Sequence, residues 1–203
     1  MELVAVDKTR SFNPPEVDEI LARCAQGDLD AFDQLINRYQ RFVFNIIYQH
    51  LGSTDEVDDI AQEVFLRVFK FINHYRGQAS FETWLYKVAL NYVRTHQRRK
   101  SVIGRFFMET PEHEDETGTT FDTIGRLADS AEDPAKSMEH GRIAEEIMEV
   151  VRKMPQMYRE VLIMREVSEM SYEEIAEVLG ASQGTIKSRL NRAREIVRRK
   201  VRI

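Results

Sequence analysis

The sequence predicts an all-α protein in which two small helical domains are joined by an acidic, flexible linker. From residue 17 to about residue 101, apolar side chains recur at three- and four-residue spacing, without the alternation of a β-strand. From residue 109 to residue 139 the chain is acidic and loses this period. Between residues 170 and 200, a capped short helix, a glycine turn and a longer basic helix follow one another. These three observations give the fold class.

Charge is distributed unevenly along the chain. The 203 residues are 42% hydrophobic and 31% charged, which is the composition of a globular protein with a hydrophobic core. The net charge of −5 and the isoelectric point near 5.6 look unsuited to binding nucleic acid. The acidic residues gather between 109 and 139, however, whereas residues 94–105 and 187–202 are basic clusters. The net charge of the whole chain therefore conceals two positively charged regions that are suited to binding nucleic acid.

Cysteine, histidine and hydropathy patterns exclude several classes of protein. The one cysteine, Cys24, permits no intramolecular disulfide, and we expect it to be a small buried side chain. The five histidines lack the spacing of metal ligands, so we expect no metal and no other cofactor. No apolar run has the length of a signal peptide or approaches about 18 residues, which predicts a cytoplasmic protein without membrane insertion. Residues 1–16, which include a Pro-Pro pair, are expected to form a mobile arm.

The first domain is expected over residues 17–102. A helix from Asp28 to Tyr39 begins with a good N-cap, and the next helix is expected to start with Ser53 and Glu56 as a capping box. The buried stripe of that second helix is expected to comprise Val57, Ile60, Ala61, Val64, Val68 and Ile72. Its opposite side carries the polar residues Asp58, Asp59, Gln62, Glu63 and Arg67, with Phe65 and Leu66 beside them as apolar anchors. Composition alone favours a solvated face here.

A loop from His74 to Ser80 leads into a helix that mixes aromatic and basic side chains. Trp84, Tyr86 and Tyr92 are interleaved with Lys87, Asn91, Arg94, Arg98 and Arg99. Aromatic rings stack on exposed bases while cations follow the backbone, so this mixture suits single-stranded nucleic acid better than a closed duplex. Trp84 and Val88 are explained equally well as core residues.

The linker is expected over residues 103–136 and the second domain over residues 137–203. Past residue 102 the chain gains acidic residues, Thr, Gly and Pro, which is typical of a linker. Helices are expected to resume near Ala135 and to supply a core from Ile143, Ile147, Val150, Val151, Met154, Val161, Leu162 and Met164. That core would support the last two helices.

The last two helices have the outline of a helix-turn-helix. Ser171 and Glu174 form a capping-box signature at the start of the first helix. Gly180 tolerates a positive φ in the turn, and Ser182 is the expected N-cap of the second helix. The apolar stripe of the second helix is expected to comprise Ile186, Leu190, Ala193 and Val197. The stripe packs, and the other face of this helix is left free.

The free face of the last helix is polar and basic. It carries Gln183, Lys187, Ser188, Asn191 and Arg192, and it is surrounded by Arg189, Arg194, Arg198, Arg199, Lys200 and Arg202. Long cationic and amide side chains contact base edges and neutralise phosphates, so the helix has the groups needed to bind duplex DNA. The plainer alternative is a solvated basic face on a structural helix, although a capped helix and a tight turn seldom precede such a face.

Taken in order, the motifs DDIAQEVFLRVFKF, YRGQASFETWLYKVALN and SYEEIAEVLGASQGTIKSRLNRARE resemble a bacterial RNA polymerase sigma factor of the extracytoplasmic-function (ECF) group of the sigma-70 family. The resemblance covers roughly residues 17 to 202 apart from the linker. It implies sigma domain 2 and sigma domain 4, and a transcription initiation factor that directs core RNA polymerase to specific promoters. Since the sequence offers no nucleophile-base pair and no phosphate-binding glycine loop, the chain is expected to redirect an enzyme without being one.

The resemblance also implies roles for individual residues. The acidic-amide face would bind the β′ clamp of the polymerase through Asp59, Gln62, Glu63 and Phe65. The minus-10 element would be recognised by Tyr75, Tyr86, Lys87, Asn91 and Arg94, with Tyr75 and Asn91 at the pocket for a base turned out of the stack. The minus-35 duplex would be bound by Ser182, Thr185, Lys187, Ser188, Arg189, Asn191 and Arg192. Of these, Lys187, Ser188, Asn191 and Arg192 match groove-facing positions, whereas Thr185 and Arg189 are better assigned to phosphates or packing.

Several partners follow from the same resemblance. Besides the β′ clamp and the promoter DNA, they are the β flap of the polymerase and an anti-sigma factor that holds the protein inactive. The acidic linker resembles a nucleic-acid mimic that threads the product channel of the polymerase. Asn191 stands where some relatives carry an aromatic residue, which leaves the preferred promoter sequence open.

Two alternatives belong to other classes of protein. A stand-alone helix-turn-helix regulator would bind a palindrome as a dimer, but it leaves the aromatic-basic helix unexplained. A DNA recombinase with a C-terminal DNA-binding domain would need a nucleophilic Ser or Tyr among acid-base groups, and the first domain offers no candidate. Substitution of Gln62 and Phe65 is expected to abolish activity only in a sigma factor.

Overall fold

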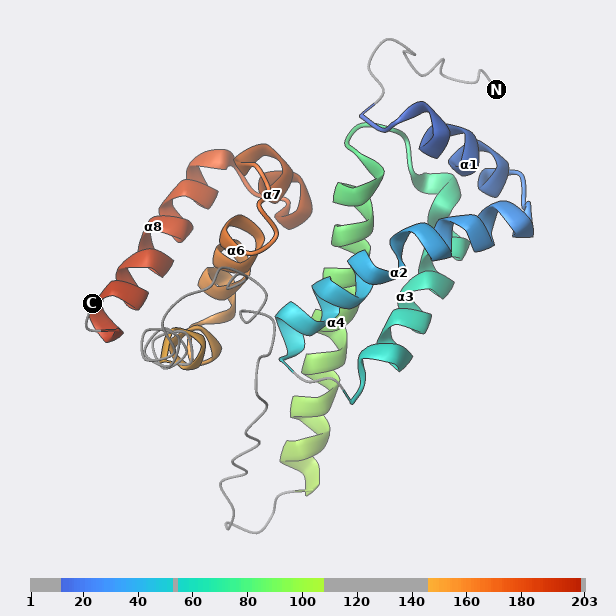
Figure 1. The fold of residues 1–203 in the computed structure, drawn as a ribbon. Helices are drawn as coiled ribbons and strands as arrows, with labels where there is room; N and C mark the ends of the chain where they lie inside the picture. Colours follow the sequence, from blue (N-terminus) through green and yellow to red (C-terminus); the bar gives the residue numbers. More distant parts are fainter. Residues whose placement is uncertain (1–11, 53–54, 108–145, 202–203) are drawn as a thin grey trace, which may run out of the picture. The chain divides into compact units, whose positions relative to one another are not determined.

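The computed structural model describes residues 12–52, 55–107 and 146–201, and the regular elements among them are all helical. The all-α fold expected from the sequence is therefore confirmed for the part of the chain that the structure describes. The chain divides between residues 112 and 113 into two compact units (Figure 1).

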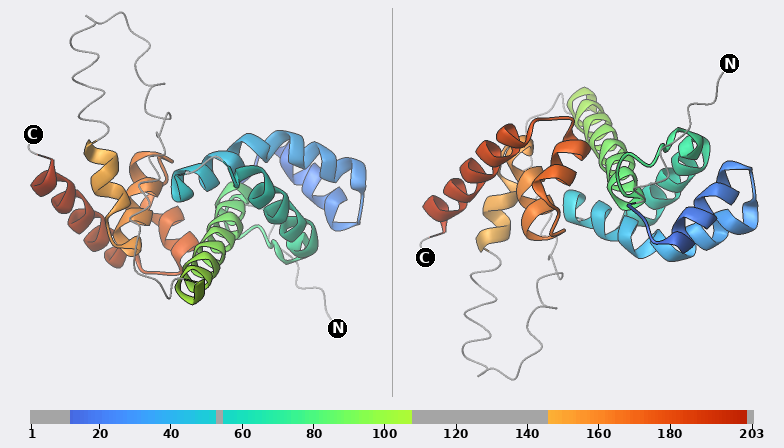
Figure 2. Two further views of the ribbon diagram at one scale, coloured as in Figure 1. Left: turned by 90° about the horizontal axis from the view of Figure 1, so that it is seen from below. Right: turned by 90° about the horizontal axis from the view of Figure 1, so that it is seen from above.

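The first unit is a helical bundle. It consists of α1 (Pro15–Ala25), α2 (Leu29–Leu51), α3 (Val57–Phe71), the short 3-10 helix η1 (Ile72–His74) and α4 (Phe81–Phe107). α2 packs against α1, α3 and α4, and α3 also packs against α4. Figure 2 shows α2, α3 and α4 side by side in both views. Almost fully buried side chains form its core: Val17, Leu35, Val43, Ile47, Val64, Val68, Phe81, Leu85 and Leu90. Cys24 is buried as expected.

The start of α3 differs from the expected capping box. α3 begins at Val57, and no side chain caps its N-terminus. The Glu56 carboxylate instead pairs with Lys100 of α4 at 3.1 Å and lies 3.5 Å from the His96 ring. Ser53, the other expected member of the box, lies outside the described residues. A contact between distant elements has thus taken the place of a local one.

Two boundaries differ from those expected. α1 already begins at Pro15, whose fixed φ suits the first helical turn, and Asn13 is hydrogen-bonded to the start of α4. The expected arm over residues 1–16 is therefore too long by several residues. α4 continues to Phe107, although the linker was expected from residue 103. Gly104 costs a helix interior only about 1 kcal/mol, which does not stop so long a helix. Residues 1–11 and 108–145, with most of the expected linker, lie outside the described residues.

The second unit is built around the helix-turn-helix. Residues 146–152 are helical and lead to α6 (Gln156–Glu166), α7 (Tyr172–Leu179) and α8 (Gln183–Lys200), which pack pairwise on one another. Its most deeply buried side chains are Val161, Met164, Ile175, Ile186, Leu190 and Ala193. Three of the four apolar positions expected in α8 are thus core, and the fourth, Val197, is half-buried. The helix expected near Ala135 lies outside the described residues.

Candidate nucleic-acid and polymerase interfaces

The helix-turn-helix of the second unit is shaped by its caps. The Ser171 hydroxyl accepts a hydrogen bond from the Glu174 amide at 3.2 Å, and the Glu174 carboxylate accepts one from the Ser171 amide at 2.8 Å. Gly180 ends α7 with a φ of 61°, in the left-handed region that favours glycine. The Ser182 hydroxyl accepts from the Thr185 amide at 3.2 Å and caps α8. The capping box, the turn and the second cap expected from the sequence are confirmed.

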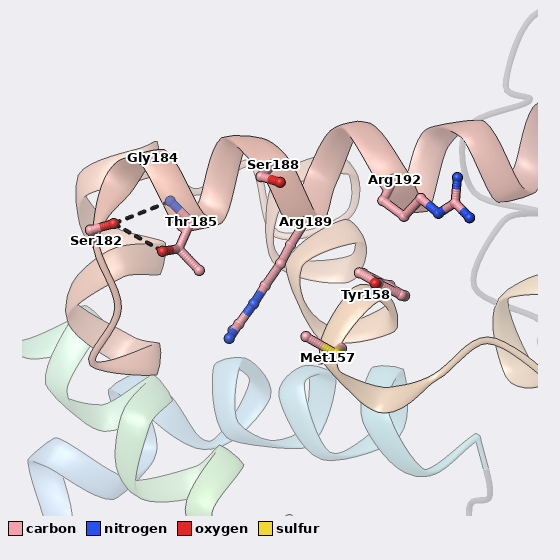
Figure 3. Close-up of a pocket in the computed structure, with 8 residues that line it drawn as sticks. All are labelled: Met157, Tyr158, Ser182, Gly184, Thr185, Ser188, Arg189 and Arg192. Carbon is pink, nitrogen blue, oxygen red and sulfur yellow. Dashed lines mark hydrogen bonds between the residues drawn. The ribbon is translucent and has the colours of Figure 1, made fainter.

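A shallow hollow of about 780 Å³ lies beside the N-terminal half of α8 (Figure 3). It is lined by Met157, Tyr158, Ser182, Gly184, Thr185, Ser188, Arg189 and Arg192. Figure 3 shows Arg189 extending from α8 on the side where Met157 and Tyr158 of α6 lie. Hydroxyl groups and guanidinium groups on one open surface are the donors that protein–DNA interfaces direct at phosphates and base edges. The hollow therefore gathers five of the residues expected at the minus-35 element.

Lys187 and Asn191 are exposed but do not line this hollow. They lie one turn apart on the neighbouring strip of α8. The Lys187 ammonium is 5.7 Å from the centre of the Tyr172 ring, and the Arg165 guanidinium lies 5.2 Å from the same ring. α8 thus presents two adjacent strips, one with Lys187 and Asn191 and one with Thr185, Ser188, Arg189 and Arg192.

The cations of α8 differ in how they are paired. Arg194 pairs with Glu166 of α6 at 2.6 Å, and this hydrogen bond raises the pKa of the guanidinium. Arg194 therefore holds α8 against α6. Arg192 pairs at 2.6 Å with Glu195 on its own helix, and Arg199 pairs with the same carboxylate. Since exposed pairs of this kind contribute little to stability, Arg192 is free to exchange its partner for DNA.

In the first unit, the loop from Tyr75 to Ser80 is built on an aromatic cluster. The Tyr75 ring lies 5.6 Å from the Phe81 ring and 5.8 Å from the Trp84 ring, and Phe81 stacks on Trp84 at 5.7 Å. The Tyr75 hydroxyl donates to the Ala79 carbonyl at 2.8 Å, and burial raises its pKa. Phe81 belongs to the core, whereas Tyr75 and Trp84 are half-buried. Parts of both rings therefore reach the surface.

Lys87, Asn91 and Arg94 follow Trp84 along one side of α4 at spacings of three and four residues. Asn91 is exposed, and the two cations are partly exposed. Together with the Tyr75 loop they form a surface that combines aromatic, amide and cationic groups. This is the mixture that proteins direct at melted nucleic acid.

Tyr86 was expected at the minus-10 element, and the structure contradicts this. Its side chain is 1% exposed, and its hydroxyl lies 2.9 Å from the His50 ring inside the first unit. Position 86 lies on the side of α4 that packs against α2, so the phenol joins these two helices and does not reach the surface.

The exposed face of α3 is acidic and amide-bearing, as expected, because Asp58, Asp59, Gln62 and Glu63 all face solvent. The expectation that Phe65 belongs to this exposed face is wrong, because its side chain is only 7% exposed and lies in the core. At 100° per residue, position 65 falls next to the buried stripe of Ala61, Val64 and Val68. Its neighbour Leu66 is 57% exposed and continues the line of Asp59, Gln62 and Glu63. Leu66 is therefore an exposed apolar side chain on this face.

Sequence reasoning missed other residues of these surfaces. Met157 and Tyr158 precede α8 by more than 20 residues, and no motif links them to it. Among the described residues, no group of three or more His, Cys, Asp or Glu side chains could hold a metal ion. The described helices include none that is long and apolar enough to cross a membrane.

The second unit has a helix-turn-helix with a basic outer face, and the first unit has an aromatic loop followed by a helix with a cationic face. Together they define a DNA-binding protein with two helical units. Comparison with protein families identifies which DNA-binding proteins it belongs to. Residues 35–102 match the model of Sigma-70 region 2, and residues 144–197 match the model of Sigma-70 region 4.

Curated relatives match over most of their length. The chain is 31% identical over 182 residues to the RNA polymerase sigma-H factor of Pseudomonas aeruginosa, and the match covers 88% of this chain and 90% of the relative. It is 32% identical over 185 residues to the ECF RNA polymerase sigma-E factor of Haemophilus influenzae, with 90% and 93% covered. It is 31% identical over 177 residues to the ECF sigma factor SigW of Bacillus subtilis, with 87% and 92% covered. The chain belongs to the ECF group of the sigma-70 family.

Solved structures share the fold. The sigma factor RpoE of Bartonella quintana, in complex with the anti-sigma factor NepR, aligns with a TM-score of 0.60 at 18% identity, over 85% of this chain and 97% of that one. CnrH, in complex with the cytosolic domain of CnrY, aligns with a TM-score of 0.57 at 22% identity, over 88% and 92%. At these identities the likeness concerns the fold alone.

Membership of this family establishes the function. The protein is a transcription initiation factor that directs RNA polymerase to promoters, in which region 2 recognises the minus-10 element and region 4 the minus-35 element. It is not itself an enzyme. Because one chain carries both regions, the two alternatives, a stand-alone dimeric regulator and a DNA recombinase, are not supported.

Proposed function

We propose that three surfaces of this chain divide the work of promoter recognition. The exposed face of α3 binds core polymerase, the Tyr75 loop with α4 binds the melted minus-10 element, and the outer face of α8 binds the minus-35 duplex. The three surfaces differ in chemistry: the first is acidic with an apolar anchor, the second is aromatic and cationic, and the third is hydroxyl-bearing and cationic.

At the minus-10 element, the proposed contacts are Tyr75, Lys87, Asn91 and Arg94. The Tyr75 ring lies at an angle to Phe81 and Trp84 and is half-buried. Its exposed part stacks on a base turned out of the DNA stack. The exposed Asn91 amide offers a donor and an acceptor to the edge of that base. Opening base pairs costs a few kcal/mol, and stacking returns roughly 1 to 3 kcal/mol per base. Lys87 and Arg94 contact the phosphates of the displaced strand.

At the minus-35 element, the proposed contacts fall into two sets with different roles, and each set of α8 side chains draws on its exposed strips. Lys187, Ser188, Asn191 and Arg192 read base edges in the major groove, and Ser182, Thr185 and Arg189 contact phosphates beside it. The hydroxyls of Ser182 and Thr185 lie 2.9 Å apart and bond to each other. Whichever hydroxyl donates in that bond, the other keeps its own hydrogen. The pair can therefore donate one hydrogen bond outward to a phosphate.

For polymerase binding, the proposed contacts with the β′ clamp are Asp59, Gln62 and Glu63, with Leu66 in the anchoring role first expected of Phe65. A half-exposed leucine flanked by carboxylates gains apolar burial on docking, while the carboxylates select a basic partner. The second unit is proposed to meet the β flap of the same enzyme, and the protein is proposed to act in the cytoplasm, where polymerase and promoter are found.

One further partner and a role for the linker are proposed from the family. The solved complexes of RpoE with NepR and of CnrH with CnrY support an anti-sigma factor for this chain as well. The acidic linker expected over residues 103–136 is proposed to lie in the product channel of the polymerase. Most of that linker falls outside the described residues, so its acidity alone supports this assignment.

The observation that carries the proposal is the exposure of three side chains: Asn91 of α4 is at the surface and Tyr75 of the preceding loop is half-buried, whereas Tyr86 of α4 is core. The test is run-off transcription by purified core polymerase, with and without this protein, on promoters from its own genome. We expect protein-dependent starts that share two spaced elements. Tyr75→Ala and Asn91→Ala should abolish starts on closed templates and spare binding to a minus-35 duplex.

A matched control is Asn37→Ala, which removes an exposed amide from α2 and should leave transcription unchanged. Gln62→Ala combined with Leu66→Ala should weaken association with core polymerase, measured directly by co-purification. If both DNA variants transcribed like the parent protein, the assignment of the Tyr75 loop and α4 to the minus-10 element would be wrong.

A further inference from the structure

Asn13 lies outside both regions matched by the family models, yet its side chain joins three elements of the first unit. Its amide nitrogen donates to the Asp18 carboxylate in α1 and to the Tyr75 hydroxyl in the loop, both at 2.8 Å. Its amide oxygen accepts from the Phe81 amide, the first of α4, at 2.7 Å. Tyr75 and Phe81 are 62 and 68 residues away along the chain.

These bonds fix the direction of the Tyr75 hydroxyl. Because the Asn13 oxygen must accept from the Phe81 amide, its nitrogen is the atom that faces Tyr75 and can only donate. The Tyr75 oxygen therefore accepts from Asn13, and its own hydrogen goes to the Ala79 carbonyl at 2.8 Å. The phenol is thus held from two sides, once by the preceding segment of the chain and once by its own loop.

The middle of the loop has no side chain of its own to pack at Gly77. Gly77 has a φ of 66°, and a Cβ placed there would meet no atom within 4 Å. The Ser80 hydroxyl caps the first turn of α4 by accepting from the Thr83 amide at 3.1 Å, which anchors the far end only. Asn13 adds a hydrogen-bonded link between Tyr75 and the start of α4 to the ring contacts that Tyr75 makes with Phe81 and Trp84.

We propose that Asn13 is a positioning residue for the minus-10 pocket. By joining the Tyr75 hydroxyl to the first turn of α4, it sets the orientation of the Tyr75 ring and hence how strongly the pocket distinguishes one base from another. Asn13 acts through Tyr75 and does not itself contact DNA. The inference rests on the proposed role of Tyr75 in holding the flipped base.

The test uses holoenzyme assembled from core polymerase and the full chain, bound to promoters whose minus-10 region is already open. Each non-template base of the element is replaced in turn, and the ratio of affinities for the preferred and the substituted template is measured. Asn13→Ala should lower the ratio roughly fivefold at the position read by Tyr75, since loss of one such hydrogen bond changes an equilibrium by roughly threefold to tenfold. Affinity for core polymerase and for a minus-35 duplex should not change.

Asn13→Asp separates the individual bonds. It keeps an acceptor for the Phe81 amide, loses both donated bonds and places a second carboxylate beside Asp18, so it should lower the ratio as Asn13→Ala does. Tyr75→Phe keeps the ring and removes the hydroxyl, and adding Asn13→Ala to it should lower the ratio no further, because the two residues act through one bond. Asn37→Ala serves as the control.

The outcomes distinguish the inference from the function on which it rests. If Tyr75→Ala abolishes discrimination but both Asn13 variants retain it, the role of Asn13 is overturned and that of Tyr75 stands. An equal loss of affinity for every open template, with the ratio unchanged, also overturns it, because Asn13 would then support only the fold. If Tyr75→Ala itself leaves the ratio unchanged, the proposed base pocket fails and the inference fails with it.

Discussion

The outer face of α8 and the Tyr75 loop are both assigned to DNA, but they are built in opposite ways. The caps that shape the helix-turn-helix join residues three positions apart, as Ser171 does with Glu174 and Ser182 with Thr185. The loop has one local bond, from the Tyr75 hydroxyl to the Ala79 carbonyl, but the Asn13 bonds that join it to other elements reach across 62 and 68 residues. A major groove accepts a regular helix whose side chains are already spaced, whereas a flipped base needs a pocket formed by several elements.

The two surfaces also differ in how they would gain affinity. α8 carries seven Lys and Arg residues against one Glu, so its binding depends on exposed charge that salt screens. The loop offers half-buried rings, whose stacking depends on contact and desolvation. Salt, substitution and pH should therefore act on the two surfaces differently.

The largest effect is expected from Leu190→Ala in the core of the second unit. Leu190 is 1% exposed, and truncation of a buried leucine costs about 2 to 5 kcal/mol of unfolding free energy. We expect the second unit to melt at lower temperature and minus-35 binding to be lost, while the first unit keeps its own transition in circular dichroism. Leu66→Ala, at an exposed leucine, is the control. A shift of both transitions together would mean that the units do not fold independently.

The next effect concerns Arg192→Ala on the exposed strip of α8. Loss of a guanidinium that contacts bases should weaken minus-35 duplex binding by about 1 to 3 kcal/mol. Because one cation leaves the interface, the slope of log affinity against log salt should also become less steep. Asn91→Ala should weaken binding to an open minus-10 template and leave that slope unchanged. Arg198→Ala, in the last turn of α8, controls for charge alone. If Arg192→Ala, Asn91→Ala and Arg198→Ala all gave the same salt dependence of DNA affinity, the proposed difference between the two surfaces would be wrong.

A smaller effect is expected from replacing the two glycines that hold a positive φ at the two surfaces. Gly180 ends α7 with a φ of 61°, and Gly77 lies in the loop with a φ of 66°. Alanine in the left-handed region costs about 1 to 2 kcal/mol. Gly180→Ala should lower the melting temperature of the second unit, whereas Gly77→Ala should mainly reduce discrimination at the minus-10 element. Gly184→Ala, inside α8, is the control for an added methyl group, since its nearest neighbour would be 3.8 Å away.

The smallest effect concerns pH and is expected from Asp28 in the first unit. The Asp28 carboxylate accepts a hydrogen bond from the Ala31 amide and pairs with Arg23, and these contacts hold its pKa below the ordinary value. Because the folded pKa is lowered, this stabilisation is present above the unfolded pKa and is lost as pH falls through the folded pKa. Asp28→Asn keeps an N-cap but removes the titration, so the first unit should melt with a weaker acid dependence. An unchanged acid dependence would show that Asp28 contributes none of it.

Two errors of sequence reasoning have different causes. Phe65 could have been recognised as a core residue, because position 65 lies beside the buried stripe of α3 on a helical wheel and Leu66 does not. Tyr86 could not, because an aromatic residue inside a basic helix suits both the core and nucleic acid. Its burial depends on the position of His50 in α2, 36 residues earlier, which no local pattern specifies.

Local sequence alone determined the all-α class, the capping box of α7, the Gly180 turn and the basic face of α8. Their causes act over a few residues: caps satisfy free amides, glycine relieves a positive φ, and the helical period sorts apolar from charged side chains. Only the tertiary structure decided that Tyr86 is core, that Leu66 and not Phe65 faces outward, that Met157 and Tyr158 border the hollow at α8, and that Asn13 holds Tyr75. These facts depend on which helices pack together, and the free energy of packing comes from contacts between residues far apart in the chain.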